Sequence, residues 1–389
     1  DVVYNHTAIT KGGNFERTAP GYFYRTDEEG KWANASGCGN ETASERPMMR
    51  RFMIESVCYW AREYHIDGFR FDLMGIHDIE TMNAIRQALD KIDPTICMYG
   101  EGWAAGEPQL PDSLLAMKKH AARLPHIGMF CDEMRDSLRG PWGNDAKGAF
   151  VIGRMGYAAG VKFGLAGGIA HPQLVSDKES TVPAFWAAQP EQMISYVSCH
   201  DDLCLADRLK ATLPGLSALE MNALAKLAAT AVFTSQGIPF WYAGDEVLRD
   251  KQGVANSYKS PDAINAINWG RKTSQRDFFD YVRGLIAMRK AHPSFRMGDA
   301  DLIAKHLEFL PVPASNVVAF RIKGSPAGDS WLNTIVVLNA RTEPVQIDVP
   351  EGRYWIACRD GRIDNVLGLG TLTGNKLVVA PRTAMIVHQ

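Results

Sequence analysis

Carboxylates end apolar runs at three places in the sequence, an arrangement that suits acid–base or nucleophilic chemistry. The three runs are GFRFD at residues 68–72, YGEGW at residues 99–103 and YVSCHDD at residues 196–202. Hydrolysis of a glycosidic bond needs a carboxylate and a carboxylic acid on either side of the bond, and retaining enzymes hold the two groups roughly 5 to 5.5 Å apart. A third carboxylate can stabilise the cationic sugar in the transition state.

The first run has the alternation of a strand that ends at a reactive edge. Phe69 and Phe71 would be buried on one face, while Arg70 and Asp72 point to the other. A guanidinium beside a carboxylate stabilises the charged form, so Arg70 would keep Asp72 ionised and nucleophilic. The alternative is an ordinary ion pair at a strand end.

In the second run a glutamate stands between two glycines and is followed by an indole. Trp103 would partly remove Glu101 from water, which favours the protonated form that a proton donor needs. The Trp103 ring could also stack on a sugar. The alternative is a glycine-rich turn with a tryptophan that packs.

The third run places His200, Asp201 and Asp202 at the end of a buried strand. A lone histidine at such a position is more often a satisfied core residue than a ligand. A zinc site built from His6, His200 and nearby acids is a further alternative, but no HExxH or comparable pair supports it.

Alternating strands and helices predict parallel β/α units over residues 1–298 and a C-terminal all-β sandwich over residues 299–389. Strands are expected at residues 1–5, 66–72, 95–101, 126–132, 195–200 and 238–243. Helices are expected at residues 48–64, 79–92 and 216–234, and a last helix, marked by apolar residues from Phe278 to Ile286, stops near Pro293. Long irregular stretches are expected at residues 7–46, 103–123 and 140–188. Because the carboxyl ends of the strands of a parallel barrel open onto one face, Asp72, Glu101 and Asp201 would converge there.

Composition favours a neutral ligand. The chain has 42 basic and 44 acidic residues and a formal net charge of −2, so it has no field that would gather nucleic acid or anionic lipid. No apolar run approaches the roughly 18 to 20 residues of a membrane span. The seven cysteines match neither a zinc pair nor a compact disulfide framework, and we expect most of them to be reduced, buried thiols.

Taken together, these segments resemble the α-amylase superfamily, glycoside hydrolase family 13. Its four signature regions occur in the expected order at residues 1–6 (DVVYNH), 68–72, 100–101 and 200–201. The resemblance implies a (β/α)8 TIM barrel. It further implies that Asp72 is the nucleophile, Glu101 the general acid/base and Asp201 the transition-state stabiliser, and that the sugar ligands in the −1 subsite are His6, Arg70 and His200.

Longer stretches resemble type I pullulanases more than α-amylases. They lie at residues 21–25, 37–41, 45–48, 71–74, 235–246 and 251–262. The resemblance implies hydrolysis of α-1,6 branch linkages in pullulan, starch or glycogen-type glucans. The alternatives are an amylase or neopullulanase that cuts α-1,4 bonds, an isoamylase-type debrancher and a non-catalytic glucan-binding relative, the last of which the intact set of three carboxylates disfavours.

The same resemblance sets the remaining expectations. No cofactor is required, and a structural calcium ion is an option although no acidic loop has recognisable spacing. We expect a monomer that binds an α-glucan polysaccharide. Candidates for stacking on sugar rings, each with a packing role as the alternative, are Tyr22, Trp103, Trp241 and Tyr258.

Departures from the family pattern lie beside the third carboxylate and at the start of the chain. The family usually has asparagine at Asp202 and often lysine at Cys199; if Asp201 and Asp202 both face the site, like-charge repulsion would favour a proton on one of them. The first signature region belongs at the end of the third barrel strand. We therefore expect a chain that lacks its first barrel strands, folds poorly and is inactive when expressed alone, with its localisation open.

Overall fold

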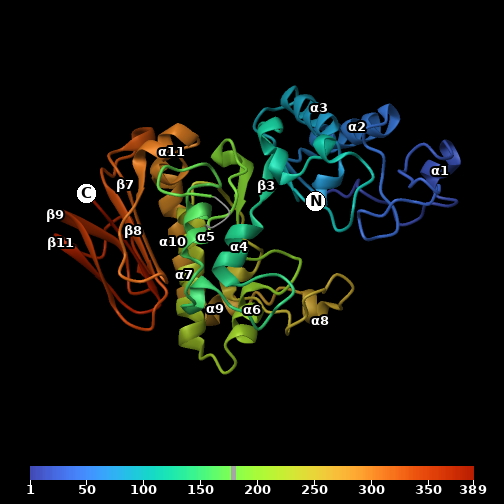
Figure 1. Ribbon diagram of the computed structural model, residues 1–389. Helices are drawn as coiled ribbons and strands as arrows, with labels where there is room; N and C mark the ends of the chain where they lie inside the picture. The colour runs from blue at the N-terminus through green and yellow to red at the C-terminus, as the bar shows by residue number, and fades with distance from the viewer. Residues whose placement is uncertain (177–180) are drawn as a thin grey trace. The chain divides into compact units, whose positions relative to one another are not determined.

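The computed structural model describes residues 1–176 and 181–389 of the chain (Figure 1). They form two compact units, residues 1–130 with 186–194 and residues 131–185 with 195–389. The boundary predicted after residue 298 lies inside the second unit and stays a prediction. No helix in the described residues is long and apolar enough to cross a membrane.

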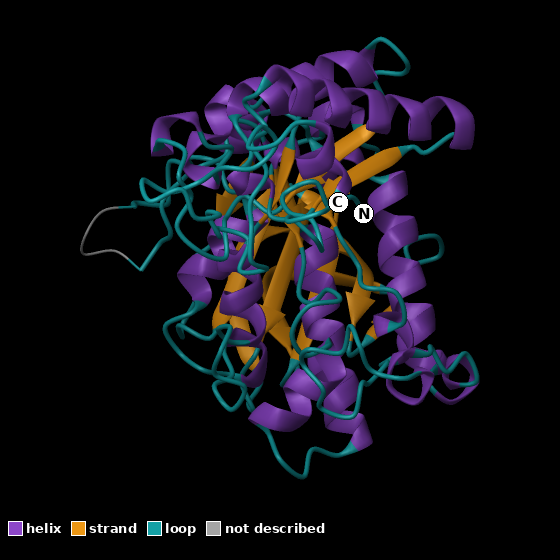
Figure 2. Cartoon of the chain, turned by 90° about the vertical axis from the view of Figure 1, so that its right-hand side faces the viewer, coloured by secondary structure: helices purple, strands orange, loops and turns teal. Residues whose placement is uncertain are grey.

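The first unit is built on short parallel strands. Long loops join many of the helices and strands of the chain (Figure 2). The register pairs Phe71 with Gly100, Gly100 with Met129 and Phe130 with Ile194, all in parallel. The strands are β1 (Gly68–Phe71), β2 (Cys97–Gly100), β3 (Gly128–Phe130) and β4 (Met193–Ser195), and the helices are α1 (Asn14–Thr18), α2 (Pro47–Tyr64) and α3 (Ile79–Asp90). Short 3-10 turns are η1 (Met74–Ile76), η2 (Asp112–Leu114), η3 (Lys118–Arg123) and η5 (Pro190–Gln192).

Local sequence explains where these helices begin and end. Pro47 occupies the first helical position of α2, where its missing N–H costs nothing, and the helix ends at His65 in the left-handed conformation (φ 54°). Asp78 caps α3, because its side chain accepts a hydrogen bond from the backbone N–H of Thr81. The predicted crossover helices at residues 48–64 and 79–92 are therefore confirmed to within two residues.

Five strands follow one another in the sheet order β1-β2-β3-β4-β5, of which β5 (Ile238–Pro239) belongs to the second unit. The strand predicted at residues 1–5 is reduced to one parallel bridge between Val2 and Phe71. Beyond this bridge the carbonyl of Asn5 accepts a hydrogen bond from the N–H of Thr42, and its side-chain amide donates to Asp72. An α/β fold with a parallel sheet is therefore established, whereas closure of eight strands into a barrel stays a prediction.

The second unit consists of helices and an antiparallel sheet. Its helices are α4 (Asp132–Arg139), α5 (Ala158–Leu165), α6 (Leu205–Thr212), α7 (Ala218–Thr234), α8 (Asp262–Asn265), α9 (Arg271–Ser274), α10 (Arg276–Ala291) and α11 (Ala300–His306). Its 3-10 turns are η4 (Phe150–Ile152), η6 (Asp245–Val247), η7 (Pro293–Arg296) and η8 (Pro326–Gly328). The helix predicted at residues 216–234 is α7, which begins at a capping box formed by Ser217 and Glu220.

The C-terminal sheet has seven strands in the order β10-β9-β12-β8-β7-β6, with β11 paired to β9. These strands are β6 (Leu307–Phe309), β7 (Val317–Ile322), β8 (Thr334–Asn339), β9 (Val345–Arg359), β10 (Arg362–Ile363), β11 (Thr371–Val379) and β12 (Thr383–His388). The all-β character predicted after residue 298 is confirmed, apart from α11. The arrangement of the strands as a two-layer sandwich stays a prediction.

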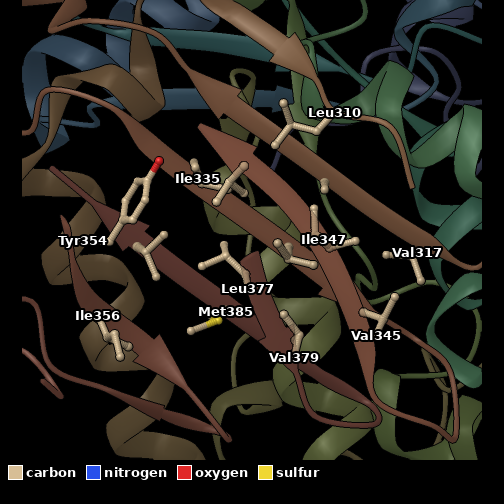
Figure 3. Close-up of a cluster of buried hydrophobic side chains, with 14 residues drawn as sticks. Leu310, Val317, Ile335, Val345, Ile347, Tyr354, Ile356, Leu377, Val379 and Met385 are labelled. Carbon is tan, nitrogen blue, oxygen red and sulfur yellow. The ribbon is translucent and has the colours of Figure 1, made fainter. Parts of the chain in front are cut away.

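Alternation along β9 supplies the core of this sheet. Val345, Ile347 and Val349 are buried, while Gln346 and Asp348 between them are exposed. The buried side chains join those of five neighbouring segments in one cluster (Figure 3). Every residue of β8 is buried, because α7 packs against the opposite face of that strand.

Truncating the core is expected to destabilise the second unit. Ile347 is 1% exposed inside the cluster, so Ile347→Ala should lower the free energy of unfolding by about 2 to 5 kcal/mol through lost burial and a residual cavity. Val378→Ala on β11, where the side chain is 58% exposed, is the matched control and should change it by less than about 0.5 kcal/mol. Urea unfolding measures both; equal effects would contradict this assignment of the core.

Candidate active site

One buried guanidinium organises the carboxylates of the first unit. Arg70 on β1 is 8% exposed, and its Nη1 lies 2.8 Å from Asp72 Oδ1 and 2.9 Å from Asp1 Oδ1. Its Nη2 lies 2.9 Å from Glu101 Oε1. Two adjacent nitrogens of one rigid fork therefore hold Asp72 and Glu101, so the structure brings these two predicted residues together.

The carboxylate of Asp72 is fixed from both sides. While Oδ1 binds Arg70, Oδ2 accepts a hydrogen bond from Asn5 Nδ2 at 2.8 Å. The same amide nitrogen donates to the Asp72 carbonyl at 2.7 Å, and His6 Nδ1 lies 2.6 Å from Asn5 Oδ1. His6 is thus linked to Asp72 through Asn5, which the sequence reasoning left without a role although it stands in the segment at residues 1–6.

Backbone groups of η1 hold Glu101. The N–H of Leu73, a residue in the left-handed conformation (φ 39°), donates to Glu101 Oε2 at 2.8 Å, and the N–H of Gly75 donates to the Glu101 carbonyl at 2.8 Å. A Cβ on Gly75 would lie 2.5 Å from the carbonyl oxygen of Trp103. Glycine is therefore required where the segment after Asp72 crosses the segment after Glu101.

Two aromatic candidates of the first unit make contacts with cations. Lys118 Nζ lies 5.6 Å from the centre of the Trp103 ring, which is partly buried. The Tyr22 ring lies under the Arg46 guanidinium at 5.6 Å, and its hydroxyl accepts a hydrogen bond from the N–H of Met48 at the start of α2. Tyr22 therefore packs against neighbouring residues, which was the alternative to a stacking role. Its stacking on a sugar ring stays a prediction.

The second unit presents His200 and Asp201 on a turn. His200 Nε2 lies 3.4 Å from Asp201 Oδ2, and the two side chains are 50% and 46% exposed. Asp202 is instead buried, and its Oδ2 lies 2.8 Å from Nη2 of Arg139. The condition for like-charge repulsion is therefore not met, because the side chain of Asp202 lies on a guanidinium while that of Asp201 is half exposed.

The remaining candidates of the second unit differ in exposure. The Trp241 ring packs against Phe233 and Phe278, with centroids 5.3 Å and 6.4 Å away, as a packing aromatic would. Tyr258 is 74% exposed, with Lys259 Nζ 5.1 Å from its ring centre. Exposure leaves the Tyr258 ring accessible to a ligand, whereas Trp241 is anchored in its own unit.

The thiols are poor candidates for nucleophiles. All seven cysteines are thiols outside any disulfide; four of them are buried, namely Cys58, Cys131, Cys204 and Cys358. Burial raises the pKa of Cys199, the thiol nearest in sequence to Asp201, to about 11, so this group is neutral at pH 7. Within residues 1–176 and 181–389 no group of three His, Cys, Asp or Glu side chains could hold a metal ion, so the zinc alternative has no ligand set there; structural calcium stays a prediction.

A buried histidine follows the Asp72 segment. His77 is fully buried after η1, neither ring nitrogen has a hydrogen-bond partner among the described residues, and burial, reinforced by the charge of Arg25, lowers its pKa to about 3. Below pH 6.5 the His77 side chain binds a proton in the unfolded chain, whereas in the folded unit it stays neutral down to about pH 3. Stability is therefore expected to fall as the pH drops from about 6.5 toward 3.

Replacing His77 should remove this acid sensitivity. The native protein should lose roughly 3 kcal/mol of unfolding free energy through this group between pH 6.5 and pH 4, whereas His77→Leu should lose correspondingly less over the same range. His126→Gln, in which the replaced side chain is 75% exposed, is the control for the loss of a histidine outside the core. Denaturant unfolding at several pH values measures this slope, and an identical slope in His77→Leu would refute the prediction.

Comparisons with known proteins point to one group of enzymes. A family model described as "Pullulanase, all-beta domain" matches residues 303–362. The chain is 38% identical over 350 residues to the pullulanase of Bacillus subtilis (strain 168), covering 90% of this chain and 47% of that protein. It is 28% identical over 385 residues to pullulanase A of Streptococcus pneumoniae serotype 4, covering 85% of this chain and 29% of that protein.

Solved structures give the same result. The pullulanase of Paenibacillus barengoltzii in complex with maltohexaose and α-cyclodextrin aligns with a TM-score of 0.90 and 42% identity over 100% of this chain and 58% of that chain. The type I pullulanase of Bacillus subtilis in complex with maltose aligns with a TM-score of 0.92 and 35% identity, covering 100% of this chain and 52% of that chain. The chain thus spans roughly half the length of these proteins.

Proposed function

Because this chain is homologous to the type I pullulanases, we propose that the protein containing it hydrolyses α-1,6-glucosidic branch linkages in pullulan, starch or glycogen-type glucans with retention of configuration. One observation carries the chemistry: Asp72 and Glu101 lie on adjacent nitrogens of the Arg70 guanidinium. That arrangement suits the short carboxyl–carboxyl spacing of a retaining mechanism.

In the proposed reaction, the Glu101 carboxylic acid gives its proton to the glycosidic oxygen while Asp72 attacks the anomeric carbon. The glycosidic bond breaks, the leaving chain departs with that proton, and a covalent glycosyl ester forms on Asp72. Glu101, now a carboxylate, takes a proton from water, whose oxygen displaces Asp72. Arg70 and Asn5 orient the nucleophile, because each binds one of its two oxygens.

We also propose that the parallel sheet is part of a (β/α)8 barrel. The carboxyl ends of barrel strands meet at one face, so Asp201 and His200 would join Asp72 and Glu101 there. Asp201 would stabilise the cationic sugar of the transition state, and His6, Arg70 and His200 would bind the sugar in the −1 subsite. Stacking on further sugar rings would fall to Trp103 and the exposed Tyr258.

The products from pullulan test the linkage preference. We expect the complete protein that contains this chain to release maltotriose, because cleavage at α-1,6 bonds leaves the α-1,4-linked trisaccharide intact. Products of the panose type would show α-1,4 cleavage and would contradict the proposal. Hydrolysis of glycogen branches without any product from pullulan would favour an isoamylase-type debrancher. The expected monomer is a separate prediction, which sedimentation of the same protein tests.

A further inference from the structure

Buried cations hold the main-chain carbonyls of the turn that carries His200 and Asp201. Nζ of Lys251 donates to the carbonyl of His200 at 3.0 Å and to the carbonyl of Asp202 at 3.2 Å. Nη1 of Arg139 donates to the next carbonyl, that of Leu203, at 2.5 Å. Buried cations therefore bind the inner side of the turn, while the His200 and Asp201 side chains stay half exposed.

The turn needs such a restraint. Asp202 has a φ of +63°, a left-handed conformation that residues with a Cβ adopt only rarely. With Asp202 in this conformation, the carbonyls on both sides of Asp201 bind one ammonium group. The ion pair between Asp202 and Arg139 holds the same residue from its side chain. If the Lys251 contacts were lost, Arg139 would still hold the side chain of Asp202 and the carbonyl of Leu203, but the carbonyls on both sides of Asp201 would lose their shared partner and the backbone at Asp201 would move more easily.

Lys251 is itself in an unusual state for a lysine. It is completely buried, and within the described part of the chain all three hydrogen bonds of its ammonium go to uncharged oxygens, the third being Oγ of Ser257 at 3.1 Å. A buried charge without a charged partner is costly. Its backbone is anchored as well, since its N–H donates to Asp207 Oδ2 at 2.6 Å. This position is therefore preorganised to present a cation to the turn.

We propose that Lys251 is a positioning residue for Asp201, fixing the turn so that the Asp201 carboxylate is preorganised for the transition state. The inference rests on the proposed function for its catalytic consequence, because Asp201 is the proposed transition-state stabiliser. Its structural content, that the ammonium of Lys251 holds the turn, stands on the contacts within the second unit alone.

The test replaces Lys251 with methionine in the complete protein and compares it with a matched loss of a buried ammonium elsewhere. Lys226→Met is that control, since Lys226 in α7 is also buried and donates to a backbone carbonyl, that of Gly361 at 2.8 Å, away from the turn. Two quantities are measured for each variant: kcat and KM on pullulan, and the hydrogen-exchange rates of the amides of residues 199–204.

Lys251→Met should lower kcat by roughly 100-fold, the order of effect expected when a catalytic group is misplaced by about 1 Å. KM should stay within about threefold, because a transition-state contact is lost rather than ground-state binding. The amides of the turn should exchange faster, and Lys226→Met should change neither quantity. If Lys251→Met does not fold, Lys251→Gln, whose amide can still donate to one carbonyl, should show the same two changes to a smaller extent.

Unchanged exchange in the turn, or a native kcat in a variant whose turn is loosened, would overturn the proposal. The two hypotheses fail separately. If the unmodified protein does not hydrolyse pullulan, the proposed function is wrong, while the exchange rates still decide whether Lys251 holds the turn.

Discussion

Asp72→Asn in the complete protein is expected to lower kcat on pullulan by on the order of 10⁴-fold or more, the scale seen when a nucleophile is removed. The amide cannot form the glycosyl ester, so the two-step route is closed. The side chain keeps its size, and its one remaining oxygen can still accept a hydrogen bond from Arg70, although its NH2 group cannot accept the one from Asn5, so the fold of the site should persist.

The control for this variant is Asp93→Asn, an equivalent change at an exposed aspartate after α3 in the same unit. It should leave kcat within about a factor of two, because a substitution on the surface, away from the core and from the carboxylates of the site, has a small effect. Thermal unfolding of both variants separates loss of chemistry from loss of structure. An Asp72→Asn protein that is folded and retains a substantial share of the native kcat would remove Asp72 from the mechanism.

Glu101→Gln is expected to have the second-largest effect, a loss of roughly 10² to 10⁴-fold in kcat on pullulan. Glutamine cannot protonate the leaving oxygen or activate water, although its one carbonyl oxygen can still accept a hydrogen bond from one of the two donors that bind Glu101, Arg70 or the N–H of Leu73. With an aryl α-glycoside of a maltooligosaccharide, whose leaving group needs no proton, the first step should proceed. The covalent intermediate should then accumulate, because its hydrolysis lacks a base.

Azide distinguishes the roles of the two carboxyl groups. As an anionic nucleophile it needs no general base, so it should restore turnover of the aryl glycoside by Glu101→Gln and give a glycosyl azide of the α configuration. Asp72→Asn cannot form the ester, so any turnover that azide restores there should come from direct displacement of the aryl group and give the β glycosyl azide. Failure of rescue in Glu101→Gln, or the α azide from Asp72→Asn, would show that the roles are assigned incorrectly.

Several features of the site could be predicted because their signals are local in the sequence. The alternation in residues 68–72 predicted that Phe69 and Phe71 are buried, and both are. The same alternation predicted that Arg70 and Asp72 lie on one face, and in the structure Arg70 Nη1 lies 2.8 Å from Asp72 Oδ1. A strand predicted at residues 95–101 ended on Glu101, and β2 ends one residue earlier.

Other features depend on contacts between distant segments and could not be predicted. Asn5 contacts the carboxylate of Asp72, 67 positions later in the chain, and an amide does not titrate, so no charge pattern reveals it. Lys251 binds main-chain carbonyls about 50 positions earlier in the chain. Every residue has such a carbonyl, so the sequence does not show which ones Lys251 contacts. The region at residues 140–188, expected to be irregular, contains α5, a short helix in which two glycines and one β-branched residue, Val161, weaken the helical signal.

Asp202 shows how a charge at the right position in the sequence can be satisfied elsewhere. Its place next to Asp201 raised the expectation of two carboxylates in one site. The left-handed backbone at Asp202 turns the side chain onto Arg139 instead, so the buried pair stabilises the turn. The backbone conformation of Asp202 thus decides whether its carboxylate faces the site or binds Arg139 behind it. The spacing of residues in the sequence does not reveal that conformation.

The anomeric configuration of the first product tests the central claim most directly. If Asp72 and Glu101 act as nucleophile and acid/base across one bond, pullulan incubated with the complete protein should release maltotriose whose new reducing end is the α anomer, detected by proton NMR before mutarotation. Initial release of the β anomer would mean a single displacement by water and would contradict the account.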